Sequence, residues 1–229
     1  MQKISMLTYL AALALFGSVP ASAGTLAVSP LRITFSGATG ISSVTVENNG
    51  REEALVQAET FAWRQVSGEH KLSTTDDVVA VPPVFRLAPG AQQQVRVGLT
   101  RAFTEKNEQT FRLTITEVPT ATVPGTVAVA VRHSLPIFVR PSSALSSNLG
   151  VKRHASNGLE IANSGSEHVR IHRWRLRDSA GAILAEDSGP GYLLSGASQV
   201  LAVTDNRIGR AALFEAESDA RTLKIAVGE

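Results

Sequence analysis

The chain of 229 residues contains no cysteine, and aromatic residues make up only 5% of it. The absence of cysteine excludes disulfide bonds, zinc–thiolate centres and cysteine nucleophiles. Charged residues account for 18%, and the formal net charge is +2 at pH 7. This balance is typical of an ordinary globular protein and predicts no strongly charged partner. Hydrophobic cores alone must hold the folded chain together.

The motifs of common enzyme and metal sites are also missing. There is no Gly-x-Ser-x-Gly nucleophile elbow and no phosphate-binding glycine loop. His168 and His172 form an H-x3-H pair, but the adjacent glutamate and third ligand of a helical zinc site do not accompany it. We interpret the two histidines as a solvated pair on a strand. The sequence predicts no catalytic residue, no metal site and no cofactor.

The most basic stretch is residues 170–177 (RIHRWRLR). Basic side chains interleaved with an aromatic could form a nucleic-acid or anionic-surface patch. The arginines point to both faces of a strand, however, and the chain as a whole is nearly neutral. We therefore favour a solvated edge strand that blocks aggregation, and we predict no nucleic-acid partner.

Residues 1–23 have the three parts of a cleavable signal peptide. Lys3 supplies a positive charge, Ile4–Phe16 is a short apolar run, and Ala21–Ala23 is a small-x-small cleavage site. The apolar run is too short to span a bilayer, and no second apolar segment could serve as an anchor. We predict an exported chain that starts at Gly24, without stable membrane anchoring.

Short alternating segments separated by turn residues predict an all-β fold in two domains. About seven strands between residues 24 and 141 have the spacing of an immunoglobulin-like sandwich, in which Pro82-Pro83 must cross between sheets or lie at an edge. Residues 100–107 could form one helical turn. Residues 142–149 (SSALSSNL) read as a linker, and residues 150–229 as a smaller β-sandwich. Its expected strands are 150–153, 158–162, 168–177, 182–185, 199–203 and 222–227, with a turn at 188–191.

The longest strand pattern is residues 126–141 (TVAVAVRHSLPIFVRP). Val127, Val129 and Val131 alternate with alanines, which is the period of a β-strand, and Pro136 should sit at an edge or a bend. Two interpretations are open. The segment could be a buried core strand, or an edge strand that lends its valines to another protein. On these residues alone, the buried interpretation is favoured.

Five segments together resemble the periplasmic pilus-assembly chaperones of the PapD-like family. They keep the family order and spacing across residues 25–141, whereas the resemblance of the second half is weak. The segments are Val28–Phe35 (VSPLRITF), Pro82–Gly90 (PPVFRLAPG), Gln94–Arg96 (QVR), Phe111–Pro119 (FRLTITEVP) and Leu135–Pro141 (LPIFVRP). The form Ser-Leu-Pro-Ile-Phe-Val, the missing cysteines and the short loop 119–125 look like the archaic branch of that family.

The resemblance implies two immunoglobulin-like domains with a cleft between them and a non-enzymatic role in the periplasm. A chaperone of this kind binds incomplete pilin-like subunits by donor-strand complementation, prevents their aggregation and delivers them to an outer-membrane usher. Val127, Val129 and Val131 match the donor residues of the long strand. Exposed donor edges could also pair with each other, which implies self-association of the free chaperone.

The resemblance also implies an anchor for the terminal carboxylate of the subunit. Arg32 matches the anchoring arginine, but Pro136 occupies the position of its lysine partner. In an antiparallel pair closed by the loop 119–125, Arg112 is expected roughly opposite His133, a few residues from Pro136. Arg112 is therefore the candidate replacement cation, because a guanidinium can hold a carboxylate with two parallel hydrogen bonds.

Four further residues belong to the expected sites. Arg96 and Arg132 are weaker candidates for the cation that replaces the lysine. Glu108 and Arg140 match family positions that couple the two domains by an ion pair.

The alternative function is that of a structural or adhesive subunit of a surface fibre. Such a subunit would carry an exchangeable extension at its mature N-terminus and a single domain. The two expected domains, and the short stub that precedes Val28, argue against it. An exported hydrolase on a β-scaffold is a third class, but no catalytic constellation supports it.

Overall fold

The computed structural model describes residues 26–37, 39–119, 130–155, 158–203 and 206–228. The described chain is built almost wholly of β-strands, and its one helical element is a short 3-10 helix, η1 (Asn206–Arg210). The helical turn expected at residues 100–107 is not formed. Within the described ranges, no helix has the length and apolar character needed to cross a membrane.

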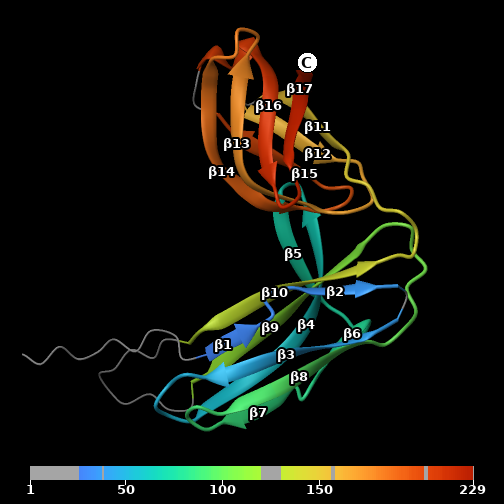
Figure 1. Cartoon of the computed structure of the whole chain (residues 1–229), viewed down its shortest axis with the longest axis vertical. Helices are drawn as coiled ribbons and strands as arrows, with labels where there is room; N and C mark the ends of the chain where they lie inside the picture. The colour runs from blue at the N-terminus through green and yellow to red at the C-terminus, as the bar shows by residue number, and fades with distance from the viewer. Residues whose placement is uncertain (1–25, 38, 120–129, 156–157, 204–205, 229) are drawn as a thin grey trace, which may run out of the picture.

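The first half of the chain forms two facing sheets, seen in the lower part of Figure 1. One sheet has the order β1 (Leu26–Ser29), β3 (Ile41–Asn48), β8 (Gln92–Leu99) and β6 (Val78–Val81). The other has the order β2 (Ile33–Ser36), β10 (Arg132–Arg140), β9 (Gln109–Val118), β4 (Ala54–Val66) and β5 (Glu69–Thr74), and β7 (Val84–Leu87) pairs with β4.

The core of this first sandwich follows the alternation in the sequence. Phe111, Leu113 and Ile115 on β9 are buried, and they belong to the same apolar cluster as Val44 and Val46 of the opposite sheet. Residues of the other parity on β9 face away from this core. β6 and β7 lie in different sheets, so the segment containing Pro82-Pro83 crosses between them as the sequence predicts.

The second half forms a seven-stranded arrangement around its own core, in the upper part of Figure 1. Its order is β14 (Ile183–Leu193), β13 (Val169–Asp178), β16 (Ala211–Ser218), β17 (Thr222–Gly228), β11 (Leu149–His154), β12 (Gly158–Asn163) and β15 (Ser198–Ala202). Trp174 and Phe214 stack in this core with ring centroids 5.8 Å apart.

Two sequence expectations for this half are wrong. The basic segment 170–177 is not an edge strand, because β13 lies between β14 and β16. Two of its four arginines form ion pairs with the flanking strands: Arg175 bonds Glu186 and Glu217, and Arg177 bonds Glu215. The expected turn at 188–191 instead lies within β14, where a bulge opposite residues 171–173 absorbs the glycines and the proline.

The long strand β10 has two different surroundings. Its C-terminal part, from Ile137 to Arg140, is paired with β2 on one side and β9 on the other. Residues 132–136 pair with β9 alone among the described strands, because β2 begins only at Ile33. The strand therefore has an interior part, as the buried interpretation predicts, and an edge part. That this edge lends valines to another protein stays a prediction.

The strand also begins later than the sequence pattern suggests. Residues 130 and 131 are described but lie outside β10, although the Glu117 N–H still donates to the Val131 carbonyl at 3.0 Å. Val127 and Val129 lie outside the described residues. The expectation of a continuous strand from residue 126 is thus not met at residues 130 and 131, where pairing with β9 is reduced to this hydrogen bond.

The two sandwiches share one packed contact region. Trp63 and Phe138, from the first sandwich, are buried in the core cluster of the second. The Gln65 side-chain amide donates to the carbonyl of Tyr192 at 2.7 Å, and its oxygen accepts from the N–H of Leu194 at 2.7 Å. These contacts cover part of the outward face of the β2–β10–β9–β4 sheet with the second sandwich and leave the adjacent part open.

Candidate binding cleft

The register of the sheet places Arg32, Pro136 and Arg112 in one row. Arg112 pairs directly with Pro136, and Arg32 immediately precedes the Ile33–Ile137 pair on the other side of β10. Ile33 and Ile137 point into the core, so the row itself faces outward. Neighbouring strands lie about 4.8 Å apart. Because β10 lies between the strands of the two arginines, their Cα atoms are roughly 10 Å from each other.

This register corrects the expected position of Arg112. His133 lies opposite Ile115, so Arg112 is shifted by three residues from the predicted partner and falls directly beside Pro136. The ladder between β9 and β10 begins only at the Thr116–Arg132 pair, whereas a pair closed by the loop 119–125 would have placed Arg112 opposite His133. The shift brings Arg112 closer to the position of the missing lysine than the sequence suggested.

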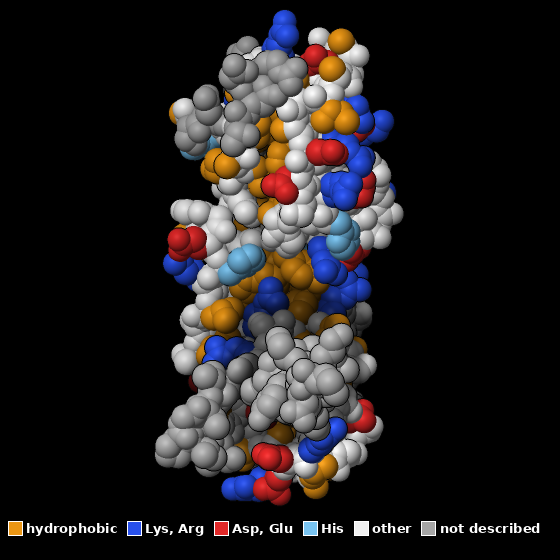
Figure 2. Space-filling model, turned by 90° about the vertical axis from the view of Figure 1, so that its left-hand side faces the viewer, with side chains coloured by type: hydrophobic (Ala, Val, Ile, Leu, Met, Phe, Trp, Pro, Cys, Tyr) orange, Lys and Arg blue, Asp and Glu red, His pale blue; other side chains and the backbone are white. Residues whose placement is uncertain are grey.

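An open cavity of about 750 Å³ lies over this row, between the two sandwiches. Figure 2 shows the surface hollowed at mid-height, where hydrophobic side chains lie beside Lys or Arg and His side chains. The cavity wall includes Arg32, Arg112, Pro136, Arg170, Tyr192 and Asp219. Both arginines chosen from the sequence thus line the same cavity, together with three residues of the second sandwich that sequence reasoning missed.

Arg112 is held by an aromatic platform and not by an acid. Its guanidinium carbon lies 3.7 Å from the centroid of the Trp63 ring and 5.9 Å from that of Tyr192, and Nη1 donates to the Ser134 carbonyl at 3.2 Å. Burial lowers the pKa of Arg112, and the nearby Tyr192 opposes this shift. No carboxylate of the described residues pairs with Arg112, so its remaining donors are available to a carboxylate from outside.

The aromatic platform is itself fixed by His70. The indole N–H of Trp63 donates to Nδ1 of His70 at 2.9 Å. Burial lowers the pKa of His70, and the positive charge of Arg112 lowers it further. Nδ1 can accept this bond only while it carries no proton, so a neutral His70 holds the ring that supports Arg112.

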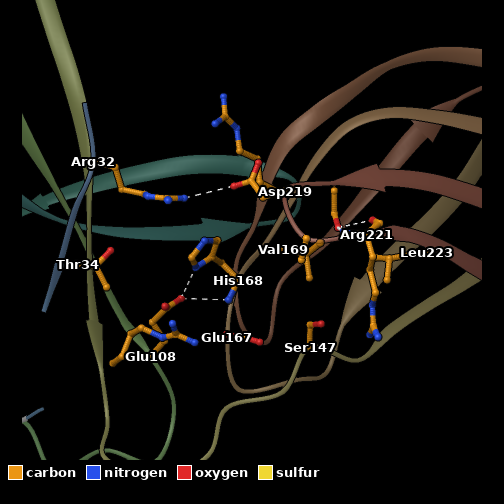
Figure 3. A pocket seen from close by; sticks show the side chains of 14 residues that line it. Arg32, Thr34, Glu108, Ser147, Glu167, His168, Val169, Asp219, Arg221 and Leu223 are labelled. Carbon is orange, nitrogen blue, oxygen red and sulfur yellow. Dashed lines mark hydrogen bonds and ion pairs between the residues drawn. The ribbon is translucent and has the colours of Figure 1, made fainter. Parts of the chain in front are cut away.

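Arg32 faces the second sandwich across the cavity. Its Nη1 donates to Oδ2 of Asp219 at 3.3 Å, as Figure 3 shows. The two side chains are 51% and 41% exposed. Arg32 therefore already has a carboxylate partner, but through one long and solvated contact.

The two weaker cation candidates do not reach the cavity wall. Arg96 is exposed on β8, which belongs to the other sheet. Arg132 shares the outward face with Arg112 but lies four residues from Pro136, about 13 Å along the strand, and its Nε donates to Thr116 at 3.3 Å. The geometry leaves Arg112 as the candidate that accompanies Arg32.

Glu108 and Arg140 both contact the second sandwich, but they do not form the expected ion pair with each other. Oε2 of the buried Glu108 accepts from the backbone N–H of His168 at 3.1 Å and lies 2.6 Å from its ring Nδ1. Arg140 donates to Oε2 of Glu167 at 2.7 Å. The coupling of the two sandwiches is thus divided between two neighbouring residues, since Arg140 pairs with Glu167 and Glu108 with His168. Figure 3 shows the contact of Glu108 with His168.

Only one of the two histidines is solvated as the sequence suggested: His172 is exposed, whereas His168 is partly buried. His168 stacks on Phe138 with ring centroids 3.7 Å apart, and it holds Glu108. His172 lies 2.5 Å from Asp219. Each histidine therefore meets its own carboxylate. No group of three or more His, Asp or Glu side chains in the described ranges is arranged to hold a metal ion.

The donor valines are only partly visible in the structure. Val131 is partly buried and lies just before β10, next to the edge formed by residues 132–136. Val127 and Val129 lie outside the described residues. The assignment of these three valines as a donor face stays a prediction.

Comparison with known families identifies the first sandwich. The family described as "Pili and flagellar-assembly chaperone, PapD N-terminal domain" matches residues 25–145, and the chain belongs to this family. The family consists of assembly chaperones and not of enzymes, in agreement with the sequence prediction.

Two curated relatives illustrate the match. The "Chaperone protein FaeE" of Escherichia coli is 28% identical over 145 residues, which cover 63% of this chain and 54% of the relative. The "Chaperone protein FimB/FhaD" of Bordetella pertussis is 24% identical over 179 residues, which cover 70% of this chain and 71% of the relative. The chain spans about half the length of the first of these relatives.

Solved structures match the whole fold. The CsuC–CsuE chaperone–tip adhesion subunit complex, from archaic chaperone-usher Csu pili of Acinetobacter baumannii, gives a TM-score of 0.70 at 18% identity, covering 90% of this chain and 100% of the matched chain. The Class 5 fimbriae chaperone CfaA gives 0.64 at 14% identity, covering 89% and 99%. At these identities the likeness concerns the fold, and it confirms two immunoglobulin-like β-sandwich domains.

Proposed function

We propose that the chain is a periplasmic chaperone that captures incomplete pilin-like subunits by donor-strand complementation, prevents their aggregation and delivers them to an outer-membrane usher. The observation that carries this proposal is the edge of β10 at residues 132–136, which ends at a cavity lined by Arg32 and Arg112. Membership of the assembly-chaperone family supports it independently.

The free edge of β10 explains how a subunit strand would bind. A sandwich that lacks one strand exposes both its core and an unpaired backbone ladder, and a strand added along this edge satisfies the ladder. The donor valines Val127, Val129 and Val131 then cover apolar surface of the subunit, worth about 25 cal/mol per Å². Release by exchange with another strand needs no nucleotide, metal or cofactor.

The place where β2 begins fixes where the subunit strand must stop. β2 occupies the edge of β10 from Ile137 onward, so an added strand can extend only as far as Pro136. Arg32 and Arg112 flank that position. A strand that ends there presents its terminal carboxylate to both guanidinium groups, which makes them the anchor of the subunit.

An anchor at this end also sets the register of pairing. A slip of one residue would turn every valine away from the subunit groove, so a fixed starting point is needed. A hydrogen bond to a charged group is worth roughly 1.5–3 kcal/mol, so its loss lowers affinity about tenfold or more.

The remaining assignments belong to the same proposal. Residues 1–23 are the export signal, residues 24–141 carry the donor strand, residues 142–149 are the linker, and residues 150–229 form the second domain. The protein belongs to the archaic branch, and the free donor edges allow self-association. The short loop 119–125 and the Ser-Leu-Pro-Ile-Phe-Val motif support the choice of branch.

Co-expression with pilin-like subunits encoded by neighbouring genes tests this function. The wild-type chaperone should co-purify from the periplasm with a soluble subunit, and Arg32→Ala should not. Arg64→Ala is the matched control, because Arg64 is an exposed arginine of the same sheet outside the anchor cavity. Equal subunit recovery with Arg32→Ala and the wild type would contradict the anchor.

A further inference from the structure

The anchor arginine of the first sandwich is paired with an acid of the second. The contact between Arg32 and Asp219, which Figure 3 shows, joins residues 187 positions apart in the chain. Both residues line the anchor cavity. Asp219 thus presents a carboxylate to the group that the subunit terminus would need. Arg112, the second cation of the anchor, has no such partner among the described acids.

Asp219 is held in place by its own sandwich. It lies in the turn between β16 and β17, where Ser218 and Arg221 exchange hydrogen bonds: the Ser218 N–H donates to the Arg221 carbonyl at 3.1 Å, and the Arg221 N–H donates to the Ser218 hydroxyl at 3.2 Å. The other carboxylate oxygen, Oδ1, lies 2.5 Å from Nε2 of His172. The turn and His172 therefore fix Asp219 whether or not Arg32 is bound.

The charges around Asp219 keep it ionised. Partial burial opposes ionisation, but the hydrogen bond with His172 and the positive charges of Arg170 and Arg32 hold the pKa of Asp219 below its usual range. Asp219 is consequently a carboxylate like the terminus of a polypeptide, and it meets the same guanidinium.

We propose that Asp219 is an internal counter-ion, which occupies Arg32 in the empty chaperone and yields it to the terminal carboxylate of a client. This inference rests on the proposed chaperone function and concerns the same cavity. The client replaces one ion pair by another, so Arg32 is never left without a partner. Asp219 remains in contact with His172 after the exchange, so the carboxylate of Asp219 is not left without a hydrogen-bond partner either.

The two contacts of Asp219 differ in length, and the longer one, to Arg32, is the one that a client carboxylate would replace. The Arg32 contact is 3.3 Å long between half-exposed side chains, whereas the His172 contact is 2.5 Å. An exposed ion pair contributes little, so its competition should weaken client binding by up to about fivefold. A ligand without a terminal carboxylate has nothing to exchange, and Asp219 should not affect its affinity.

The test measures the affinity of the full chain for two synthetic peptides. Both carry one short sequence of alternating valine and threonine, one ending in a free carboxylate and the other in an amide. Asp219→Asn, which keeps the shape and an oxygen acceptor for His172, should bind the carboxylate peptide about two- to fivefold more tightly than the wild type. Its affinity for the amide peptide should equal that of the wild type.

Two further variants separate this effect from charge and folding. Glu217→Gln removes one negative charge from the same strand end, at a residue that pairs with Arg175 outside the cavity, and it should change neither affinity. In the Arg32→Ala background, Asp219→Asn should give no gain.

Unchanged or weaker carboxylate binding by Asp219→Asn, or an equal gain for the amide peptide, would overturn the counter-ion proposal while leaving subunit capture intact. If the wild type binds neither peptide, or binds both equally, the terminal-carboxylate anchor itself fails, and the counter-ion proposal fails with it.

Discussion

Replacement of Arg112 by methionine separates the contribution of this partly buried guanidinium to subunit capture from its contribution to folding. Methionine keeps an unbranched side chain that can lie on the Trp63 ring, but it removes the charge and the donors. Arg112 should therefore matter for capture much more than for folding. An ordinary structural arginine would show the opposite balance.

The expected magnitudes follow from the contacts of Arg112. The stacking on Trp63 is worth about 0.5–2 kcal/mol, and the charge is partly desolvated without a counter-ion, which opposes that gain. The free energy of unfolding of Arg112→Met should thus differ from that of the wild type by less than about 1 kcal/mol. Loss of a charge-assisted bond to the client carboxylate removes roughly 1.5–3 kcal/mol, a decrease in affinity of about tenfold or more.

Denaturant unfolding followed by tryptophan fluorescence gives the stability, and titration with a purified pilin-like subunit gives the affinity. Arg112→Lys serves as an intermediate, because it keeps the charge but loses the two-pronged geometry. Normal subunit affinity in Arg112→Met would remove Arg112 from the anchor. A loss of stability above about 3 kcal/mol would show that the residue mainly supports the fold.

Three other predictions concern the donor face, the energy source and pH. Val129→Asp should abolish subunit capture, because it places a charge in an apolar groove, and the variant should stay folded; unfolding, or capture at the wild-type level, would place this residue in the core. Transfer of a subunit to a competing strand should proceed in EDTA without ATP, and strict dependence on either a metal or a nucleotide would refute strand exchange. The pKa of His70 is lowered in the folded state. Neutral His70 should therefore contribute fully to stability above the ordinary histidine pKa of about 6.5, and this contribution should decline as the pH falls through the lower pKa that His70 has in the folded protein. The unfolding midpoint should therefore decrease below about pH 6.5, and less so in His70→Gln; equal slopes in both proteins would exclude His70 as the cause.

Local patterns in the sequence predict the strands of the first sandwich well, because alternation reports directly which side chains face the core. Phe111, Leu113 and Ile115 are buried as their parity predicts. The same reasoning failed for β13. Its arginines suggested a solvated edge, but Glu186 on the next strand and Glu215 on the more distant β16 pair with Arg175 and Arg177, and β13 takes an interior position. Pairing between distant strands is not visible in the local pattern.

The site shows the same limit. Arg32 was found by resemblance and Arg112 from the expected register of an antiparallel strand pair, and the structure brings both to one cavity. Arg170, Tyr192 and Asp219 could not be chosen, because they come from the half of the chain with little resemblance and reach the cavity only through the packing of the two sandwiches. The division of Glu108 and Arg140 between His168 and Glu167 likewise depends on how the sandwiches meet.

Hydrogen exchange of the chaperone with and without a bound pilin-like subunit tests strand capture most directly. An added strand would use the backbone groups on the edge of β10 that the described strands leave unpaired, so subunit binding should slow amide exchange at residues 130–135; Pro136 has no amide hydrogen to exchange. Residues 137–140 already lie between β2 and β9 and should change little. Slowed exchange confined to other strands, or unchanged exchange at residues 130–135 in a stable complex, would contradict subunit capture along this edge.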